Sequence, residues 1–142
     1  VNRYLPYETW QSWDDAKRWY DRVLERRAIG EAAQFVILRK QQSTLVGTAI
    51  AFDYVADSNS IEIGYVLART AWRQGVMSEV LTTLLPALAD HLSLSGFRAN
   101  VECDNTASLK LLAKLGFQSL DVVTKEDGTR LQRLTKTTKT AL

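Results

Sequence analysis

Residues 61–78, IEIGYVLARTAWRQGVMS, contain the arrangement from which the fold of this chain follows. Alternating apolar residues predict a strand from Ile61, a polar loop follows at Arg69–Gln74, and Gly75 precedes a long apolar helix. A chain that passes from a strand through such a loop into a helix leaves backbone N–H groups unpaired beside the positive end of the helix dipole. The stretch therefore predicts an anion site made of backbone.

The residues around Gly75 argue against a nucleoside triphosphate or a dinucleotide as the anion. The P-loop pattern GxxxxGK[ST] needs a lysine after its second glycine, whereas Val76, Met77 and Ser78 follow Gly75. The dinucleotide pattern GxGxxG does not occur in the sequence. A single glycine at a strand-to-helix turn also fits an ordinary helix start, so other residues have to decide between the two interpretations.

A second motif, N-x-x-S-x-x-x-L-x-x-x-G-F, covers Asn105–Phe117. We predict a strand that ends at Cys103 and a short helix over Thr106–Leu115. Asn105 is the expected N-cap of this helix, and Gly116 is the expected C-cap. The two motifs together define a layout that is more specific than either motif alone.

Together the two motifs resemble the GNAT superfamily of N-acetyltransferases, and most closely its ribosomal-protein N-terminal (RimJ/RimL-like) branch. The resemblance rests on E-I-G-Y-x-L-x-x-x-x-W-x-x-G and on N-x-x-S followed by G-F, and its layout extends from Arg3 to Thr137. It implies an α/β (α+β) GNAT fold, with a mixed, mostly antiparallel sheet that is flanked by helices and splayed between the family's fourth and fifth strands. It also implies acetyl-CoA as co-substrate and a primary amine as acceptor.

The remaining elements follow from periodicity and turn residues, and we expect one domain over residues 1–142. The expected elements are a helix over Trp13–Ile29, strands over Gln34–Arg39, Leu45–Asp53, Ile61–Ala68 and Arg98–Cys103, and two C-terminal strands joined at Glu126–Gly128. The helix after Gly75 has its apolar face at Val80, Leu81, Leu84, Leu85, Leu88 and Leu92. The family has a further strand before the segment that Tyr4 begins to resemble, so we expect the first strand to be missing or supplied from elsewhere.

Composition limits the partners. The net charge of +2 does not indicate a nucleic-acid-binding surface. The apolar stretch Val76–Leu94 is interrupted by Thr82, Pro86 and Asp90 and does not suit a membrane span. The single cysteine, Cys103, suits a reducing compartment. We therefore expect a cytoplasmic protein, monomer or homodimer, without nucleic-acid or membrane partners and without a metal.

The resemblance also assigns the coenzyme contacts. The backbone amides of Gln74–Ser78 are expected to hold the pyrophosphate. The family pattern is [RQ]-x-x-G-x-[GA]; Trp72 stands in its first slot, as in the ribosomal-protein branch, and Met77 departs from it in the last slot. Backbone groups of Val66 and Leu67 are expected to pair with the pantetheine arm, and Asn105 is expected to bond a pantetheine amide. The full coenzyme-binding set is Val66, Leu67, Arg73, Gln74, Gly75, Val76, Met77, Ser78 and Asn105.

Acetyl transfer needs a base, because a protonated amine does not attack a thioester. Amine pKa values of about 8 for an α-amino group and above about 10 for lysine mean that most acceptors arrive charged. A base, or a water that it positions, has to take the proton. Glu62 is the predicted base, since its place before Ile63 resembles the glutamate of the histone acetyltransferase branch. An exposed strand glutamate is the alternative for Glu62, and Glu102 is the second candidate for the base.

The departing thiolate needs a proton or a hydrogen bond. Many GNAT enzymes have a tyrosine at the position where this chain has Leu112. Ser108 is the catalytic substitute that the ribosomal-protein branch offers, and its unactivated hydroxyl suits a hydrogen bond to the sulfur or the pantetheine.

Two functions follow as hypotheses. The first is an acetyl-CoA-dependent N-acetyltransferase that acts on a small-molecule or peptide primary amine, with a protein N-terminal α-amine favoured by the resemblance. The second is a non-catalytic CoA-binding regulatory or vestigial GNAT domain, motivated by Met77, Leu112 and the missing first strand.

Overall fold

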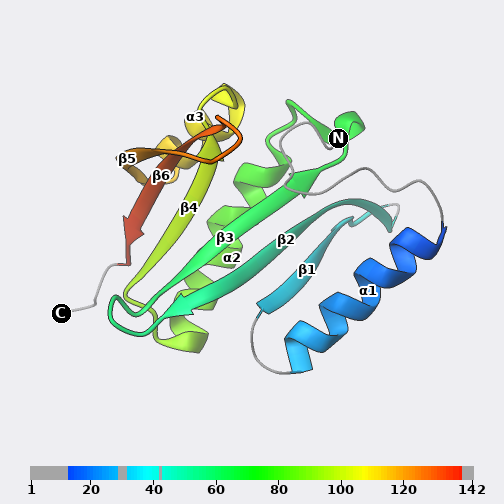
Figure 1. Cartoon of the computed structure of the whole chain (residues 1–142). Helices are drawn as coiled ribbons and strands as arrows, with labels where there is room; N and C mark the ends of the chain where they lie inside the picture. Colours follow the sequence, from blue (N-terminus) through cyan, green and yellow to red (C-terminus); the bar gives the residue numbers. More distant parts are fainter. Residues whose placement is uncertain (1–12, 29–31, 42, 139–142) are drawn as a thin grey trace.

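A computed structural model of the chain describes residues 13–28, 32–41 and 43–138 (Figure 1). The elements in chain order are α1 (Trp13–Ala28), β1 (Ala32–Arg39), β2 (Thr44–Val55), β3 (Ser60–Leu67), the 3-10 turn η1 (Arg69–Ala71), α2 (Val76–Leu92), β4 (Gly96–Glu102), α3 (Thr106–Lys114), β5 (Gln118–Thr124) and β6 (Arg130–Thr137). The predicted helices and strands are present at nearly the expected bounds. Ile29, the expected end of α1, and the segment around Tyr4 lie outside the described residues.

The strands form one sheet in the order β1-β2-β3-β4-β6-β5. All neighbouring pairs are antiparallel except β3 and β4, which run parallel. The ladder between these two strands extends only from Ser60↔Gly96 to Glu62↔Arg98. The mixed, mostly antiparallel sheet is therefore confirmed, and the predicted splay lies between β3 and β4, beyond Glu62.

The apolar face of α2 packs against the sheet and forms the centre of the core. Figure 1 shows α2 behind the central strands, with α1 alongside β1. The buried residues of α2 are Met77, Leu81, Leu85 and Leu88. The helical period places Leu92 on the same face, but 46% of it is exposed, because α2 ends there and Ser93 turns into the left-handed conformation. None of the described helices has the length and apolar character that crossing a bilayer requires.

Candidate functional site

The splay of the sheet leaves one edge of β3 open along its second half. The main-chain N–H of Ala68 donates to the carbonyl of Val46 on β2, at 2.7 Å. Because main-chain groups alternate sides along a strand, those of Val66 also face β2, whereas those of Tyr65 and Leu67 face the opening. The Leu67 carbonyl accepts a hydrogen bond from Trp72 Nε1 at 2.8 Å. The geometry thus favours Tyr65 and Leu67, rather than Val66 and Leu67, as main-chain partners for a ligand in the opening.

The loop after β3 leads directly into the exposed start of α2. Gly75 has a left-handed backbone, with φ 72° and ψ 14°, and Arg73 before it has φ 62°. Gly75 has no side chain with which to cap the helix, so the N–H groups of Val76, Met77 and Ser78 have no partner within α2. A Cβ at Gly75 would meet nothing within 4 Å, so the space beside this residue is open. These features fit the predicted anion site.

Side chains of the loop tie it to the rest of the domain. Arg39 Nη2 donates to Gln74 Oε1 at 3.0 Å, and Gln74 Nε2 donates to the carbonyl of Thr70 at 2.9 Å. The guanidinium of Arg69 lies over the Trp72 ring, 5.5 Å from its centroid. Because the Gln74 side chain serves the loop itself, its predicted part in anion binding rests on its backbone amide.

Met77 departs from the small residue of the family pattern, but its side chain does not lie at the helix start. Only 5% of the residue is exposed, and it belongs to the core cluster with Leu81 and Phe97. The bulk of the methionine is therefore packed beneath α2. The departure in sequence therefore adds a core side chain and no exposed bulk at the start of the helix.

Glu62 lies at the point where β3 and β4 part. Its side chain is 14% exposed, so the alternative of an exposed strand glutamate is wrong. Asn100 Nδ2 donates to Glu62 Oε1 at 3.1 Å, and Arg98 Nη1 lies 3.7 Å from the same oxygen. Burial raises the pKa of Glu62 above its ordinary value, while the Arg98 charge and the Asn100 hydrogen bond act in the opposite direction. A carboxyl with a raised pKa suits a general base.

Arg98 is held in place by β2 and β3. Its Nε donates to Ser60 Oγ at 2.9 Å, and its Nη1 pairs with Asp53 Oδ2 at 3.3 Å. Its Nη2 donates to the main-chain carbonyl of Asp53. Asp53 lies where the β2–β3 register shifts, between Phe52 and Val55, and has a φ of 53°. The irregularity of β2 thus anchors the cation beside Glu62.

Glu102, the second candidate for the base, ends β4. It alternates with the buried Val101 and is partly exposed, as expected for a residue that faces away from the core. It lies beyond the last paired residues of β3 and β4.

The second motif forms the first turn of α3. Asn105 Oδ1 accepts a hydrogen bond from the Ser108 N–H at 3.2 Å, which confirms the predicted N-cap. Leu112, at the position of the family's tyrosine, is fully buried in the core. Ser108 Oγ lies 2.5 Å from Tyr65 Oη across the opening. Sequence reasoning missed Tyr65, although its place in the E-I-G-Y motif was a signal.

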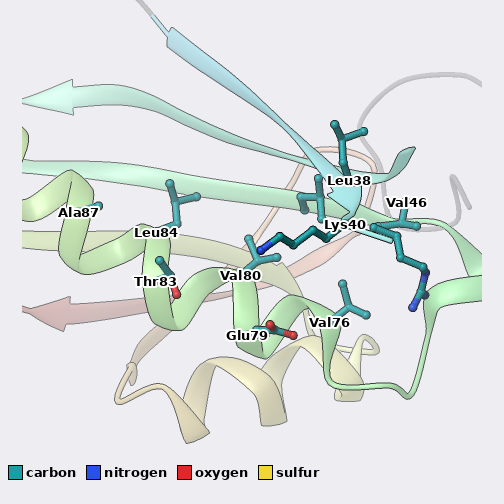
Figure 2. Close-up of a pocket in the computed structure, with 11 residues that line it drawn as sticks. Leu38, Lys40, Val46, Val76, Glu79, Val80, Thr83, Leu84 and Ala87 are labelled. Carbon is teal, nitrogen blue, oxygen red and sulfur yellow. The ribbon is translucent and has the colours of Figure 1, made fainter. Parts of the chain in front are cut away.

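A separate groove lies between β1 and α2 (Figure 2) and has a volume of about 510 Å³. It is lined by Ile37, Leu38, Arg39, Lys40, Val46, Val76, Glu79, Val80, Thr83, Leu84 and Ala87. Figure 2 shows its apolar wall on α2, formed by Val80 and Leu84. Val76 is the one predicted site residue that lines it, so this groove is distinct from the opening between β3 and β4.

A model of the acetyltransferase (GNAT) domain family matches residues 1–118, most of the chain. The chain belongs to the GNAT family. The family assignment from the two sequence motifs is therefore confirmed, and the parallel, partly paired β3 and β4 are the family's splayed strands.

Known proteins similar to this GNAT domain carry related names. The uncharacterized N-acetyltransferase p20 of Bacillus licheniformis is 31% identical over 119 residues, which cover 83% of this chain. The match spans 66% of the length of that relative.

Solved structures share the fold at low sequence identity. Ribosomal-protein-S5-alanine acetyltransferase of Vibrio fischeri is 20% identical, with a TM-score of 0.77, over 93% of this chain and 78% of its own. Spermidine N-acetyltransferase of Vibrio cholerae, solved with CoA and spermine, is 17% identical, with a TM-score of 0.82, over 96% of this chain and 81% of its own. At these identities the likeness establishes the fold.

Proposed function

We propose that this GNAT domain moves the acetyl group of acetyl-CoA directly to a primary amine. The observation that carries the proposal is that one strand, β3, connects the three parts of the site: the base, the hydroxyl group for the departing sulfur, and the phosphate-binding loop. Glu62 lies on β3, and Ser108 is hydrogen-bonded to Tyr65 of β3. The loop before α2 is tied to β3 through the bond from Trp72 to Leu67.

The residues present fit the coenzyme. The exposed start of α2, with open space above Gly75, suits the pyrophosphate, since helix N-termini bind anions through N–H groups and the dipole. The open edge of β3 suits the amide groups of the pantetheine arm, with Tyr65 and Leu67 as the main-chain partners. Asn105 caps α3 through its Oδ1, and within the described part of the chain its Nδ2 has no hydrogen-bond partner, which leaves it for a pantetheine carbonyl.

When bound, acetyl-CoA supplies an activated acetyl group. Glu62, or a water that it positions, takes a proton from the incoming amine, and the raised pKa of Glu62 brings it closer to that of the amine. The new carbon–nitrogen bond forms as the carbon–sulfur bond breaks, and the electron pair of the broken bond stays on sulfur. The hydroxyl of Ser108 donates a hydrogen bond to that sulfur.

We further propose a peptide N-terminal α-amine as the acceptor and the cytoplasm as the location. The acceptor follows from the E-I-G-Y and N-x-x-S motifs, which resemble the ribosomal-protein branch. A polyamine is the second candidate acceptor, since a fold neighbour is named a spermidine N-acetyltransferase. The single Cys103 supports a reducing compartment.

A coenzyme-binding domain without turnover is the second candidate function. The observation that favours it is the complete burial of Leu112, which puts a core leucine where many family members carry a tyrosine. Under this alternative the protein binds acetyl-CoA and acetylates no amine. A panel of peptide N-terminal amines, polyamines and lysine side chains separates the two functions.

The base is tested by comparing Glu62→Gln with Glu102→Gln. We expect Glu62→Gln to lower kcat by roughly 100-fold or more, because a positioned base contributes about that much, while the Kd for acetyl-CoA stays unchanged. Glu102→Gln should retain the unaltered rate. The reverse pattern would assign the base to Glu102, and equal rates in all three proteins would remove both carboxylates from the mechanism.

The anion site is tested with a matched pair of variants at Gly75. Asn and Asp both tolerate the left-handed backbone there, have nearly the same size and differ in charge. We expect Gly75→Asp to weaken acetyl-CoA binding at least about tenfold through repulsion of the pyrophosphate, and Gly75→Asn to retain most of the affinity. Isothermal titration calorimetry gives both constants, and equal affinities would exclude the helix start as the phosphate site.

A further inference from the structure

We propose that Tyr65 is a positioning residue, whose phenol donates to Ser108 Oγ and thereby directs the Ser108 hydroxyl proton toward the departing sulfur. The inference rests on the proposed acetyl transfer and assigns a role to a residue that the sequence motifs left without one. It concerns the same opening between β3 and β4.

The two hydroxyl groups meet across the opening, each held by its own element. Tyr65 Oη and Ser108 Oγ are 2.5 Å apart, and both residues are partly buried. Ser108 is fixed from the other side by the bond from its N–H to Asn105 Oδ1. Tyr65 is fixed by β3, where it lies opposite the buried Ala49 of β2. The pair is therefore built into the fold from two directions.

The chemistry of the two groups sets the direction of the bond. Each hydroxyl has one proton to donate, so only one of them is the donor in this contact. Burial raises the pKa of Tyr65, with the Ser108 hydrogen bond acting in the opposite direction, so the phenol stays protonated near neutral pH. A phenol is a stronger acid than an aliphatic hydroxyl and is the better donor. Donation from Tyr65 leaves the Ser108 proton for a third group.

Tyr65 supplies the tyrosine hydroxyl that position 112 lacks. Leu112, where many family members have a tyrosine, is fully buried and offers no hydroxyl. The phenol of Tyr65 instead reaches the first turn of α3 from β3. This chain thus has a tyrosine hydroxyl beside the N-x-x-S motif, although no tyrosine occurs within that motif.

Tyr65 and Ser108 lose no proton in the reaction. The amine gives one proton to Glu62 and then to solvent, and the thiolate later takes one proton from solvent, so the protons balance. Ser108 stabilises the negative charge on sulfur while the carbon–sulfur bond breaks. Tyr65 acts through Ser108, which makes the effects of the two residues dependent on each other.

A double-mutant cycle with Tyr65→Phe, Ser108→Ala and the combined variant tests this dependence. We expect each single variant to lower the single-turnover acetyl-transfer rate about tenfold, as for one lost hydrogen bond in the transition state, without changing the Kd for acetyl-CoA. The combined variant should be no slower than Ser108→Ala. Tyr54→Phe is the matched control, since Tyr54 is an exposed residue of β2 whose hydroxyl donates to Asn59 Oδ1 at 2.9 Å.

Three outcomes would overturn the proposal. An unaltered rate in Tyr65→Phe removes the positioning role and leaves the proposed acetyl transfer standing. Additive losses in the combined variant show that Tyr65 does not act through Ser108. Acetyl-CoA binding without transfer to any amine in the unaltered protein overturns the proposed function and the role of Tyr65 with it. Thermal unfolding of each variant confirms that the compared proteins are folded.

Discussion

Two opposing effects set the charge of the Glu62 carboxyl. Burial favours the neutral form, whereas the Arg98 guanidinium and the Asn100 amide favour the ionised form. Arg98 is held by Ser60 and Asp53, so its attraction for Glu62 is part of the fold and not the result of a mobile surface pair. Arg98 thus limits the rise in the pKa of Glu62.

Replacing Arg98 should therefore change the pH dependence of the reaction. A base acts in its ionised form, so the rate rises with pH through the pKa of Glu62. In Arg98→Met the pKa of Glu62 rises further, and the acidic limb of the pH–rate profile moves to higher pH. We expect about a fivefold lower rate on that limb and equal rates on the plateau. Arg98→Lys keeps the charge and should retain the original profile, and a profile that is identical in all three proteins contradicts this account.

At the level of elements, β3 consists of two halves with different neighbours. Its first half, Ser60–Glu62, pairs with both β2 and β4, whereas its second half pairs with β2. Gly47 of β2 lies opposite the end of the second half, at Leu67. A Cβ on Gly47 would lie 2.4 Å from the Val66 carbonyl oxygen, so the two backbones approach too closely for any side chain there.

The substitution Gly47→Ala should destabilise the domain by about 1–3 kcal/mol, because a backbone carbonyl has to move to relieve the overlap. Gly64→Ala is the matched control in the facing strand. Its Cβ would meet the Ile50 side chain at 3.2 Å, and a side chain adjusts at lower cost than a backbone, so we expect a loss below about 1 kcal/mol. Urea denaturation measures both free energies of unfolding, and equal losses would show that the β2–β3 approach is not tight.

At the level of the whole molecule, the splay separates two groups of strands. β1, β2 and β3 form one group, β4, β6 and β5 form the other, and three residue pairs join them, Ser60↔Gly96, Ile61↔Phe97 and Glu62↔Arg98. α2 packs its buried leucines against the core that both groups share. A ligand that lies in the opening and contacts both groups binds the folded state and not the unfolded chain.

Acetyl-CoA should therefore raise the melting temperature of the domain. At a concentration of about 100 times its Kd, binding to the folded state alone adds about 2.7 kcal/mol of stability. For a domain of this size we expect a rise of roughly 5–10 °C in a thermal unfolding assay. Gly75→Asp should show a much smaller rise at the same concentration, and equal shifts in both proteins would mean that the coenzyme does not contact the start of α2.

Local signals in the sequence determined the elements and part of the site. The helical period of Leu81, Leu85 and Leu88 predicted the core face of α2, and the N-x-x-S motif predicted the Asn105 cap. The two motifs were enough to place the chain in the GNAT family, and the family resemblance implied the splayed sheet. These features depend on residue types at fixed spacings along the chain, so the linear sequence is sufficient to reveal them.

The tertiary structure decided which distant groups meet. Arg98 lies beside Glu62 because β3 and β4 pair at those residues, and Tyr65 meets Ser108 because β3 faces the first turn of α3. The side of β3 that stays open, which favours Tyr65 over Val66, depends on its register with β2. Spacing within a strand shows which residues share a face, but strand register and the packing of helices on the sheet determine what that face contacts.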